Sequence, residues 1–345
     1  MLPLHPQLAA EFAIAGFGNE FRRNYLDGFF TGIGAKDLLT ASQNTSDLFA
    51  RATTDTAGII YYVLSTVHRG RMMAGYGADR LGPGKRFLDV GCGFGGSLVA
   101  AFELGAQVYG IEIDPTRLTA AKALMADNEI SARLEPCDIF TECFHDFPKM
   151  NLIVSENVIE HVDDPRRFIE TMFAKLEGGG ALVLEIPNAR ALRSVTSDPH
   201  YHLPFITLLN YESAFKLFDC ILKIDQYGQA YSVGDYFPLA WYRNVLVGKA
   251  AKITVSYRAD ALQSFEETPA LLAKLDEALE RAVLLYAPLP PLMREEVLHK
   301  ARTYVSDVKM AHASCLESGG TTSTHFADFE STYLAPAWLM RFDHS

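Results

Sequence analysis

The stretch RFLDVGCGFGGS, residues 86–97, decides the fold of this chain. It opens with a short apolar run, which is typical of a buried strand. Glycines follow at positions 91, 93, 95 and 96, and apolar residues at helical spacing come after them. Glycine lets a chain turn tightly and lets backbone N–H groups approach a ligand closely. The stretch therefore predicts a strand, a glycine-rich turn and a helix whose positive end faces a ligand.

Strand-like and helix-like segments alternate from Arg86 to about residue 250. The expected strands are RFLDV, QVYGI, SARLE, NLIVS, ALVLEI, ILKID and NVLVG, at residues 86–90, 107–111, 131–135, 151–155, 181–186, 221–225 and 244–248. Parallel strands need crossover helices, so the alternation predicts an α/β fold with a doubly wound, mostly parallel sheet of seven strands. Ligands of such sheets bind at the carboxyl ends of the strands.

The regions on either side of this core have a helical pattern. We expect residues 1–84 to form a helical N-terminal region that acts as a lid and selects the substrate. We expect residues 85–250 to form the cofactor-binding core. We expect residues 251–345 to form a helical region that caps the substrate or forms an oligomer interface. Long amphipathic segments on both sides of APLPP, at residues 287–291, support this last expectation.

Composition narrows the class of partner. The chain is 49% hydrophobic and 21% charged, with a net charge of −11, which is ordinary for a globular protein. An acidic surface without a basic cluster disfavours nucleic acid. The N-terminus lacks a signal-peptide pattern and no segment is long and apolar enough to span a membrane. We therefore expect a cytoplasmic protein with a small-molecule substrate, no membrane association and a possible homodimer.

Five scattered cysteines form no CxxC pair, and no histidine or acid cluster has metal-ligand spacing. We expect reduced thiols and no metal. A divalent-metal mechanism is accordingly disfavoured.

The glycine-rich turn alone leaves two types of cofactor open. Gly91, Gly93 and Gly96 also satisfy the fingerprint of a dinucleotide site. Asp89, two residues before the first glycine, distinguishes them, because a carboxylate at the mouth of the strand repels a pyrophosphate and attracts a cationic amino-acid group. A turn-stabilising or capping acid is the structural alternative for Asp89.

This combination resembles motif I of the class I S-adenosylmethionine-dependent methyltransferases, which have a Rossmann-like fold. Their cofactor carries an ammonium and a sulfonium. The second strand ends in Glu112, whose carboxylate can accept hydrogen bonds from the ribose hydroxyls. Asp114 precedes Pro115, so we assign it to capping the next helix. After the third strand the resemblance implies that Asp138 bonds the adenine amino group and Ile139 packs on the ring.

The fourth junction, SENVIEHV at residues 155–162, resembles the ubiquinone-biosynthesis type of small-molecule methyltransferase. In that group the loop faces the methionine end of the cofactor and the acceptor. The resemblance therefore implies S-adenosyl-L-methionine as cofactor and the following binding residues: Asp89, Gly91, Cys92, Gly93, Glu112, Ile113, Asp138, Ile139, Glu156 and Asn157. PHYHLPF, at residues 199–205, resembles a histidine-aromatic element of the same relatives.

The expected reaction is methyl transfer to a small molecule, at oxygen in a metabolite, natural product or sugar. A hydroxyl acceptor must lose a proton, and histidine suits that task near neutral pH. His161 and His202 are the candidate bases, with His200 given less weight, although a loop histidine also serves in packing. Methylation of nitrogen or of a thioether sulfur in a small acidic metabolite stays open, as does a cofactor-binding regulator without catalysis.

Overall fold

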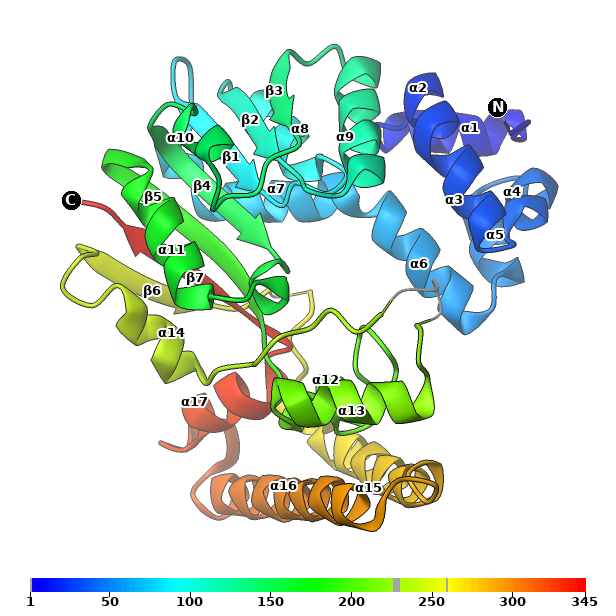
Figure 1. Ribbon diagram of the computed structural model, residues 1–345, viewed down its shortest axis with the longest axis vertical. Helices are drawn as coiled ribbons and strands as arrows, with labels where there is room; N and C mark the ends of the chain where they lie inside the picture. The colour runs from blue at the N-terminus through cyan, green and yellow to red at the C-terminus, as the bar shows by residue number, and fades with distance from the viewer. Residues whose placement is uncertain (1, 226–229, 259) are drawn as a thin grey trace.

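The computed structural model describes residues 2–225, 230–258 and 260–345 (Figure 1). Within these residues the chain builds a seven-stranded sheet with the order β3-β2-β1-β4-β5-β7-β6. Strands β1 to β5 are parallel, whereas β7 runs antiparallel to both β5 and β6. The strands are β1 Arg86–Val90, β2 Gln107–Ile111, β3 Ala132–Glu135, β4 Met150–Glu156, β5 Leu176–Pro187, β6 Lys252–Ser256 and β7 Ala337–Asp343. The predicted α/β, doubly wound, mostly parallel sheet is confirmed.

Both faces of the sheet are buried, because successive side chains of each strand point to opposite sides. Phe87 and Leu152 belong to one apolar core, and their chain neighbours Leu88 and Ile153 to another. The first core packs under α7 Thr66–Tyr76, α8 Gly96–Glu103 and α9 Pro115–Asp127. The second packs under α10 Glu142–His145, α11 Pro165–Ala174 and α14 Leu239–Val245.

The N-terminal region is helical, as expected, and packs beside α9 (Figure 1). Its helices are α1 Pro6–Ile14, α2 Asn19–Phe21, α3 Asp27–Gly32, α4 Lys36–Ala41, α5 Thr45–Arg51 and α6 Thr54–Leu64. The carboxylate of Asp127, at the end of α9, accepts hydrogen bonds from the backbone N–H groups of Gly18, Glu20 and Phe21 at 2.8–3.0 Å. These bonds satisfy donors at the start of α2 that the helix itself leaves unpaired.

The last two strands lie outside the predicted core. After β5 the chain leaves the sheet, and it returns only with β6 and β7, so the sheet crosses the predicted boundary at residue 250. The region 251–345, which was expected to be helical, thus also contributes two strands to the sheet. The long helices α15 Thr268–Leu285 and α16 Pro291–Glu317 lie below the sheet and pack on α12 Leu192–Thr196, near α13 Tyr211–Ile221 and α17 Phe326–Phe329 (Figure 1).

Two expected strands, ILKID and NVLVG, are wrong. Ile221 ends α13, and the residues after it expose their apolar side chains, Leu222 and Ile224. The second segment contains the end of α14, where Val245 and Leu246 pack into the core beneath the helix. Each apolar run lies at or just after the end of a helix, and a short apolar run does not by itself distinguish a helix end from a strand.

The cysteines also differ from expectation. Cys137 and Cys143 form a disulfide, while Cys92, Cys220 and Cys315 are free. The prediction of reduced thiols is therefore wrong for the pair beside the loop after β3. Among the described residues, no helix combines the length and apolar character needed to cross a membrane.

The crossing of α7 and α8 generates a prediction about stability. A Cβ atom on Gly70 would overlap the carbonyl carbon of Gly96, whereas one on Gly75, in the same helix, would meet nothing within 4 Å. We expect Gly70→Ala to lower the free energy of unfolding by at least about 2 kcal/mol, because backbone atoms must move apart. Gly75→Ala is the matched control and should raise it by about 0.5–1 kcal/mol. Urea unfolding of both variants measures this, and equal effects would contradict the close crossing.

Candidate active site

The turn after β1 has the backbone geometry that its glycines were expected to permit. Gly91, Gly93 and Gly95 have φ of 76°, 51° and 84°, in the left-handed region that favours glycine. A Cβ on Gly91 would also overlap the side chain of Val158. The turn therefore requires glycine here both for its conformation and for space. It delivers the chain into α8, whose N-terminus faces the strand ends.

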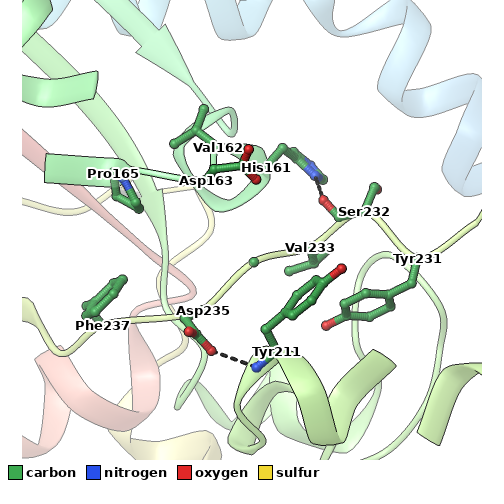
Figure 2. Close-up of a pocket in the computed structure, with 11 residues that line it drawn as sticks. His161, Val162, Asp163, Pro165, Tyr211, Tyr231, Ser232, Val233, Asp235 and Phe237 are labelled. Atoms are coloured by element: carbon green, nitrogen blue, oxygen red, sulfur yellow. Dashed lines mark hydrogen bonds between the residues drawn. The ribbon is translucent and has the colours of Figure 1, made fainter. Parts of the chain in front are cut away.

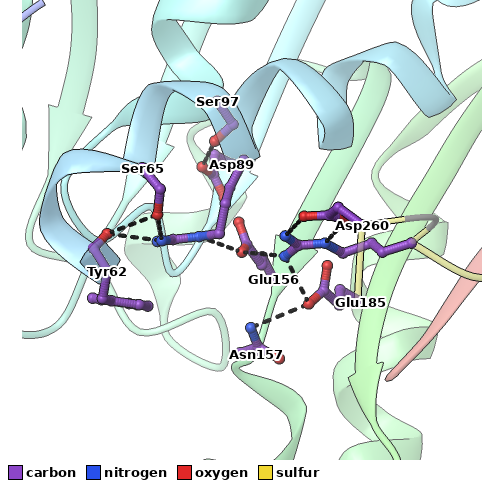
Figure 3. Close-up of polar contacts among 10 residues, drawn as sticks. Tyr62, Ser65, Asp89, Ser97, Glu156, Asn157, Glu185 and Asp260 are labelled. Carbon is purple, nitrogen blue, oxygen red and sulfur yellow. Dashed lines mark hydrogen bonds and ion pairs between the residues drawn. The ribbon is translucent and has the colours of Figure 1, made fainter. Parts of the chain in front are cut away.

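Asp89 lies buried beneath this turn. Its carboxylate accepts a hydrogen bond from the Ser97 hydroxyl at the start of α8 (Figure 3). Burial raises the pKa of Asp89 to about 7; the bond from Ser97 opposes this rise, and the nearby Glu156 and Glu112 add to it. A carboxyl group in this position is poised to ionise when a cation arrives.

Glu112 holds the turn from the neighbouring strand end. One carboxylate oxygen accepts from the Gly93 N–H and the other from the Asp114 N–H, both at 2.9 Å. Asp114 in turn accepts from the N–H groups of Thr116 and Arg117, so its predicted role as a helix cap is confirmed. Ile113, between the two acids, is 74% exposed, which leaves an apolar surface free at this edge.

The loop after β3 carries the next two predicted residues. Asp138 is exposed and accepts from the Phe140 N–H at 2.9 Å, and Ile139 is buried. The disulfide of Cys137 and Cys143 closes this short loop. Because β1, β2 and β3 are parallel neighbours, their carboxyl ends bring these residues to the same edge as Asp89 and Glu112.

Glu156 and Asn157, at the end of β4, join a network of charges that Figure 3 shows. The Arg69 guanidinium, on α7, donates to Glu156 at 3.0 Å. It also donates to the Tyr62 carbonyl and the Ser65 hydroxyl, both at 2.7 Å. Asn157 has a φ of 52° and its amide donates to Glu185 at 3.4 Å. A non-glycine residue held in this conformation often marks a functional site.

Glu185 and Arg258 belong to this network and were not among the predicted site residues. Arg258, just after β6, lies 3.5 Å from the carboxylate of Glu185 and 3.9 Å from that of Glu156. Burial, with the nearby Glu156, raises the pKa of Glu185. Because Arg258 reaches the site only through the late strand β6, nothing in its local sequence signals the contact.

His161 lies at the wall of a cavity of about 550 Å³ (Figure 2). The wall is formed by His161, Val162, Asp163, Pro165, Tyr211, Tyr231, Ser232, Val233, Gly234, Asp235 and Phe237. Burial lowers the pKa of His161 to about 4, so its ring is neutral at physiological pH. The ring Nδ1 lies 2.9 Å from the Ser232 carbonyl oxygen.

The histidine that joins His161 is His200 rather than the predicted His202. The rings of His161 and His200 lie 5.1 Å apart in an edge-to-face arrangement. His202 has an exposed side chain and does not line the cavity. The catalytic role of His202 stays a prediction. The buried Glu160 lies beside both rings of the pair. Both histidines were expected near the site, but their grouping with Glu160 was not predicted, because His200 lies in a loop after α12 that no periodicity places next to β4.

Comparison with known proteins agrees with this architecture. Residues 68–222 match the family described as a methyltransferase domain. The ubiquinone biosynthesis O-methyltransferase of Methylobacterium sp. (strain 4-46) is 32% identical over 34% of this chain and 49% of its own length. The mitochondrial ubiquinone biosynthesis O-methyltransferase of Schizosaccharomyces pombe is 31% identical over 29% of this chain and 37% of its length. The chain thus spans half or less of these curated relatives.

Among solved structures, phosphoethanolamine N-methyltransferase 2 of Haemonchus contortus aligns over 85% of this chain and 57% of its own, with 16% identity and a TM-score of 0.42. A likeness at that level carries no weight for the reaction. The sequence matches do support the resemblance that the strand-end motifs predicted. Residues 68–222 of this chain match a methyltransferase domain, in agreement with the resemblance to the class I, S-adenosylmethionine-dependent enzymes that the motifs indicated.

Proposed function

We propose that this protein transfers a methyl group from S-adenosyl-L-methionine to an oxygen atom of a small hydroxylated molecule. The observation that carries the proposal is the buried Asp89 carboxyl beneath a glycine-rich turn, inside a region that matches a methyltransferase domain. A buried carboxyl with a raised pKa favours a cationic ligand over a phosphate. The cofactor's amino-acid end is such a cation.

The remaining strand-end residues suit the other parts of the cofactor. Gly91, Cys92 and Gly93 would bring backbone groups close to its amino-acid end. Glu112 already accepts two backbone N–H groups, yet an ionised carboxylate has about four lone pairs, so it can also accept from ribose hydroxyls. Ile113 would contact the adenosine from its exposed position.

The loops after β3 and β4 complete the proposed site. Asp138 and Ile139 would hold the adenine, as the resemblance implies. Glu156 and Asn157 would border the methionine end. Arg69, whose guanidinium is already fixed by Glu156, Ser65 and the Tyr62 carbonyl, stands near enough to the same strand end to attract the cofactor's carboxylate.

Methyl transfer from a sulfonium is an in-line displacement, so the protein's main task is to hold donor and acceptor at attack distance. Such positioning is worth roughly 7–11 kcal/mol. A hydroxyl acceptor also loses a proton. We place that step at His161: an Nδ1–H that donates to the Ser232 carbonyl leaves Nε2 with a free lone pair. The cavity that His161 borders would hold the acceptor.

A second candidate acceptor is an amine. Two acids, Asp163 and Asp235, and two tyrosines, Tyr211 and Tyr231, share the cavity with His161. Carboxylates and aromatic faces both attract an ammonium group, so the lining favours nitrogen methylation as the alternative. Thioether methylation and cofactor binding without catalysis have no such feature in their favour. Three further expectations stay predictions: that the N-terminal helices act as a lid, that the protein forms a homodimer, and that it is cytoplasmic.

The raised pKa of Asp89 predicts how cofactor binding depends on pH. Its apo pKa is about 7, so acidification from pH 8 to pH 6 protonates the carboxyl and removes the charge that attracts the ammonium. We expect affinity for S-adenosylhomocysteine to fall about tenfold over this range. Asp89→Asn should bind weakly at pH 8 and lack this part of the pH dependence. Calorimetric titration of both proteins separates the effect from titration of the ligand's own amine, and parallel pH profiles would contradict it.

The role of His161 is tested by turnover. We expect His161→Ala to reduce kcat by about 10²–10⁴-fold for a hydroxyl acceptor, since a general base contributes that much, and to leave cofactor affinity unchanged. The double variant with His202→Ala shows whether the second predicted histidine contributes. Unchanged turnover with both histidines removed would exclude base-assisted transfer and favour an acceptor without a proton to lose.

The acceptor itself is best found without assuming its class. The protein is incubated with labelled S-adenosylmethionine and a fractionated metabolite extract, and the labelled product is identified by mass. We expect a methyl ether; a methylated amine would establish the second candidate. Failure to bind the cofactor at micromolar concentration would overturn the proposed function.

A further inference from the structure

Three side chains beside the acceptor cavity converge on one point. Glu160 and His161 belong to the short helical turn Ile159–His161 after β4, and His200 lies in the loop after α12. The Nε2 atoms of His161 and His200 lie 3.8 and 3.9 Å from the same Glu160 carboxylate oxygen, Oε1. The three potential ligand atoms all lie within 4.8 Å of one another.

The other ring nitrogen of each histidine faces an oxygen acceptor. Nδ1 of His161 lies 2.9 Å from the Ser232 carbonyl oxygen, and Nδ1 of His200 lies 3.4 Å from the Asp198 carboxylate. Asp198 is itself fixed by the backbone N–H groups of His200 and Tyr201. When both rings are neutral and carry their proton on Nδ1, each Nε2 presents a lone pair to Glu160. Burial opposes protonation of His200, but Asp198 and Glu160 raise its pKa, so a proton competes with any other cation for its Nε2.

In that neutral state two lone pairs point at a carboxylate, and the arrangement is repulsive unless a proton on His200 or a metal cation lies between them. The side chain of Glu160 is 2% exposed, and its second oxygen, Oε2, has no hydrogen-bond partner. A buried carboxylate without a partner is costly. Histidine ligands of metals in proteins commonly donate their other N–H to a carboxylate or a backbone carbonyl, as both rings do here.

We propose that Glu160, His161 and His200 bind a divalent transition-metal cation. Two imidazole nitrogens and one carboxylate oxygen suit Zn²⁺ or Mn²⁺, whereas Mg²⁺ prefers an all-oxygen shell. Ligands at about 2.1 Å from a tetrahedral ion lie about 3.4 Å apart. The observed separations of 3.8 and 3.9 Å require a closure of about half an ångström, which side-chain torsions supply.

The consequence for chemistry rests on the proposed function. Three protein ligands leave a coordination position open, and His161 brings the cluster to the wall of the acceptor cavity. An acceptor hydroxyl bound there loses its proton to water more readily, because the cation lowers its pKa. The oxygen then attacks the methyl carbon while the carbon–sulfur bond breaks and its electron pair stays on sulfur. In this form His161 is a ligand rather than the base.

Metal binding is tested directly, without turnover. Protein dialysed against EDTA and then freed of it is titrated calorimetrically with Zn²⁺, Mn²⁺ and Mg²⁺. We expect one Zn²⁺ or Mn²⁺ per chain and little binding of Mg²⁺. Glu160→Gln and His200→Ala should each weaken Zn²⁺ binding at least 100-fold, and Asp198→Asn, which acts through His200, by about 10–100-fold. His145→Ala removes an exposed histidine on α10 and should bind like the wild type.

The same samples are titrated with S-adenosylhomocysteine, whose binding reports that each variant is folded. Absence of a stoichiometric Zn²⁺ or Mn²⁺ site in protein that binds this ligand overturns the metal site and leaves the proposed function standing; the cluster then holds a proton only. Metal binding that survives both Glu160→Gln and His200→Ala also overturns it. Metal binding without binding of S-adenosylhomocysteine would contradict the proposed function and leave the metal site standing.

Measurements of turnover distinguish a metal ligand from a simple base at His161. With the metal, His200→Ala should reduce kcat as much as His161→Ala does, and EDTA should reduce it at least tenfold until Zn²⁺ or Mn²⁺ is restored. With His161 as a simple base, His200→Ala would retain most activity and EDTA would have no effect. That second pattern contradicts the catalytic part of the inference.

Discussion

The close crossing of α7 and α8 at Gly70 and Gly96 is the contact on which the rest of the site depends. Because neither residue has a Cβ, the two backbones meet directly. Gly96 is the first residue of α8, so the same contact fixes the end of the glycine-rich turn. It also sets Arg69, one residue before Gly70, against Glu156 at the end of β4. The N-terminal helices and the sheet edge are consequently one structural unit, and a larger side chain at either glycine disturbs both.

The charge balance at this edge explains why two separate cations are proposed. Burial raises the pKa values of Asp89 and Glu160 to about 7, and also raises the pKa of Glu185. Arg258 lies next to Glu185, whereas among the described residues no arginine or lysine forms an ion pair or a hydrogen bond with Asp89 or Glu160. An unpaired buried acid favours whatever cation can reach it. The cofactor's ammonium would meet this need at Asp89, and a metal ion at Glu160, on the donor and acceptor sides of the site.

The features that could be predicted from the sequence are those fixed by residues close together in the chain. The turn at Gly91 and the helix cap at Asp114 follow from residues within a few positions of each other, and the structure has both. The positions of the first five strands along the chain followed from the alternation of strand-like and helix-like segments. Strands β6 and β7 were missed because their pairing forms only after the chain has left the sheet and returned. Arg258 and His200 were missed or given little weight for the same reason, since each reaches the site through tertiary packing.

The long segment between β5 and β7 also forms part of the cavity that His161 borders. The chain leaves after β5 and re-enters beside it as β7, and Asn188 ties the two ends together: its side-chain amide donates to the carbonyl oxygens of Ser331, Thr332 and Ala335. Its backbone N–H donates to the Pro336 carbonyl at 2.9 Å. Residues between these ends supply Tyr211, Tyr231 and Asp235 to the cavity wall. A segment closed at its base in this way can change its lining without moving β1 to β4, so under the proposed function acceptor selectivity would be separable from cofactor binding.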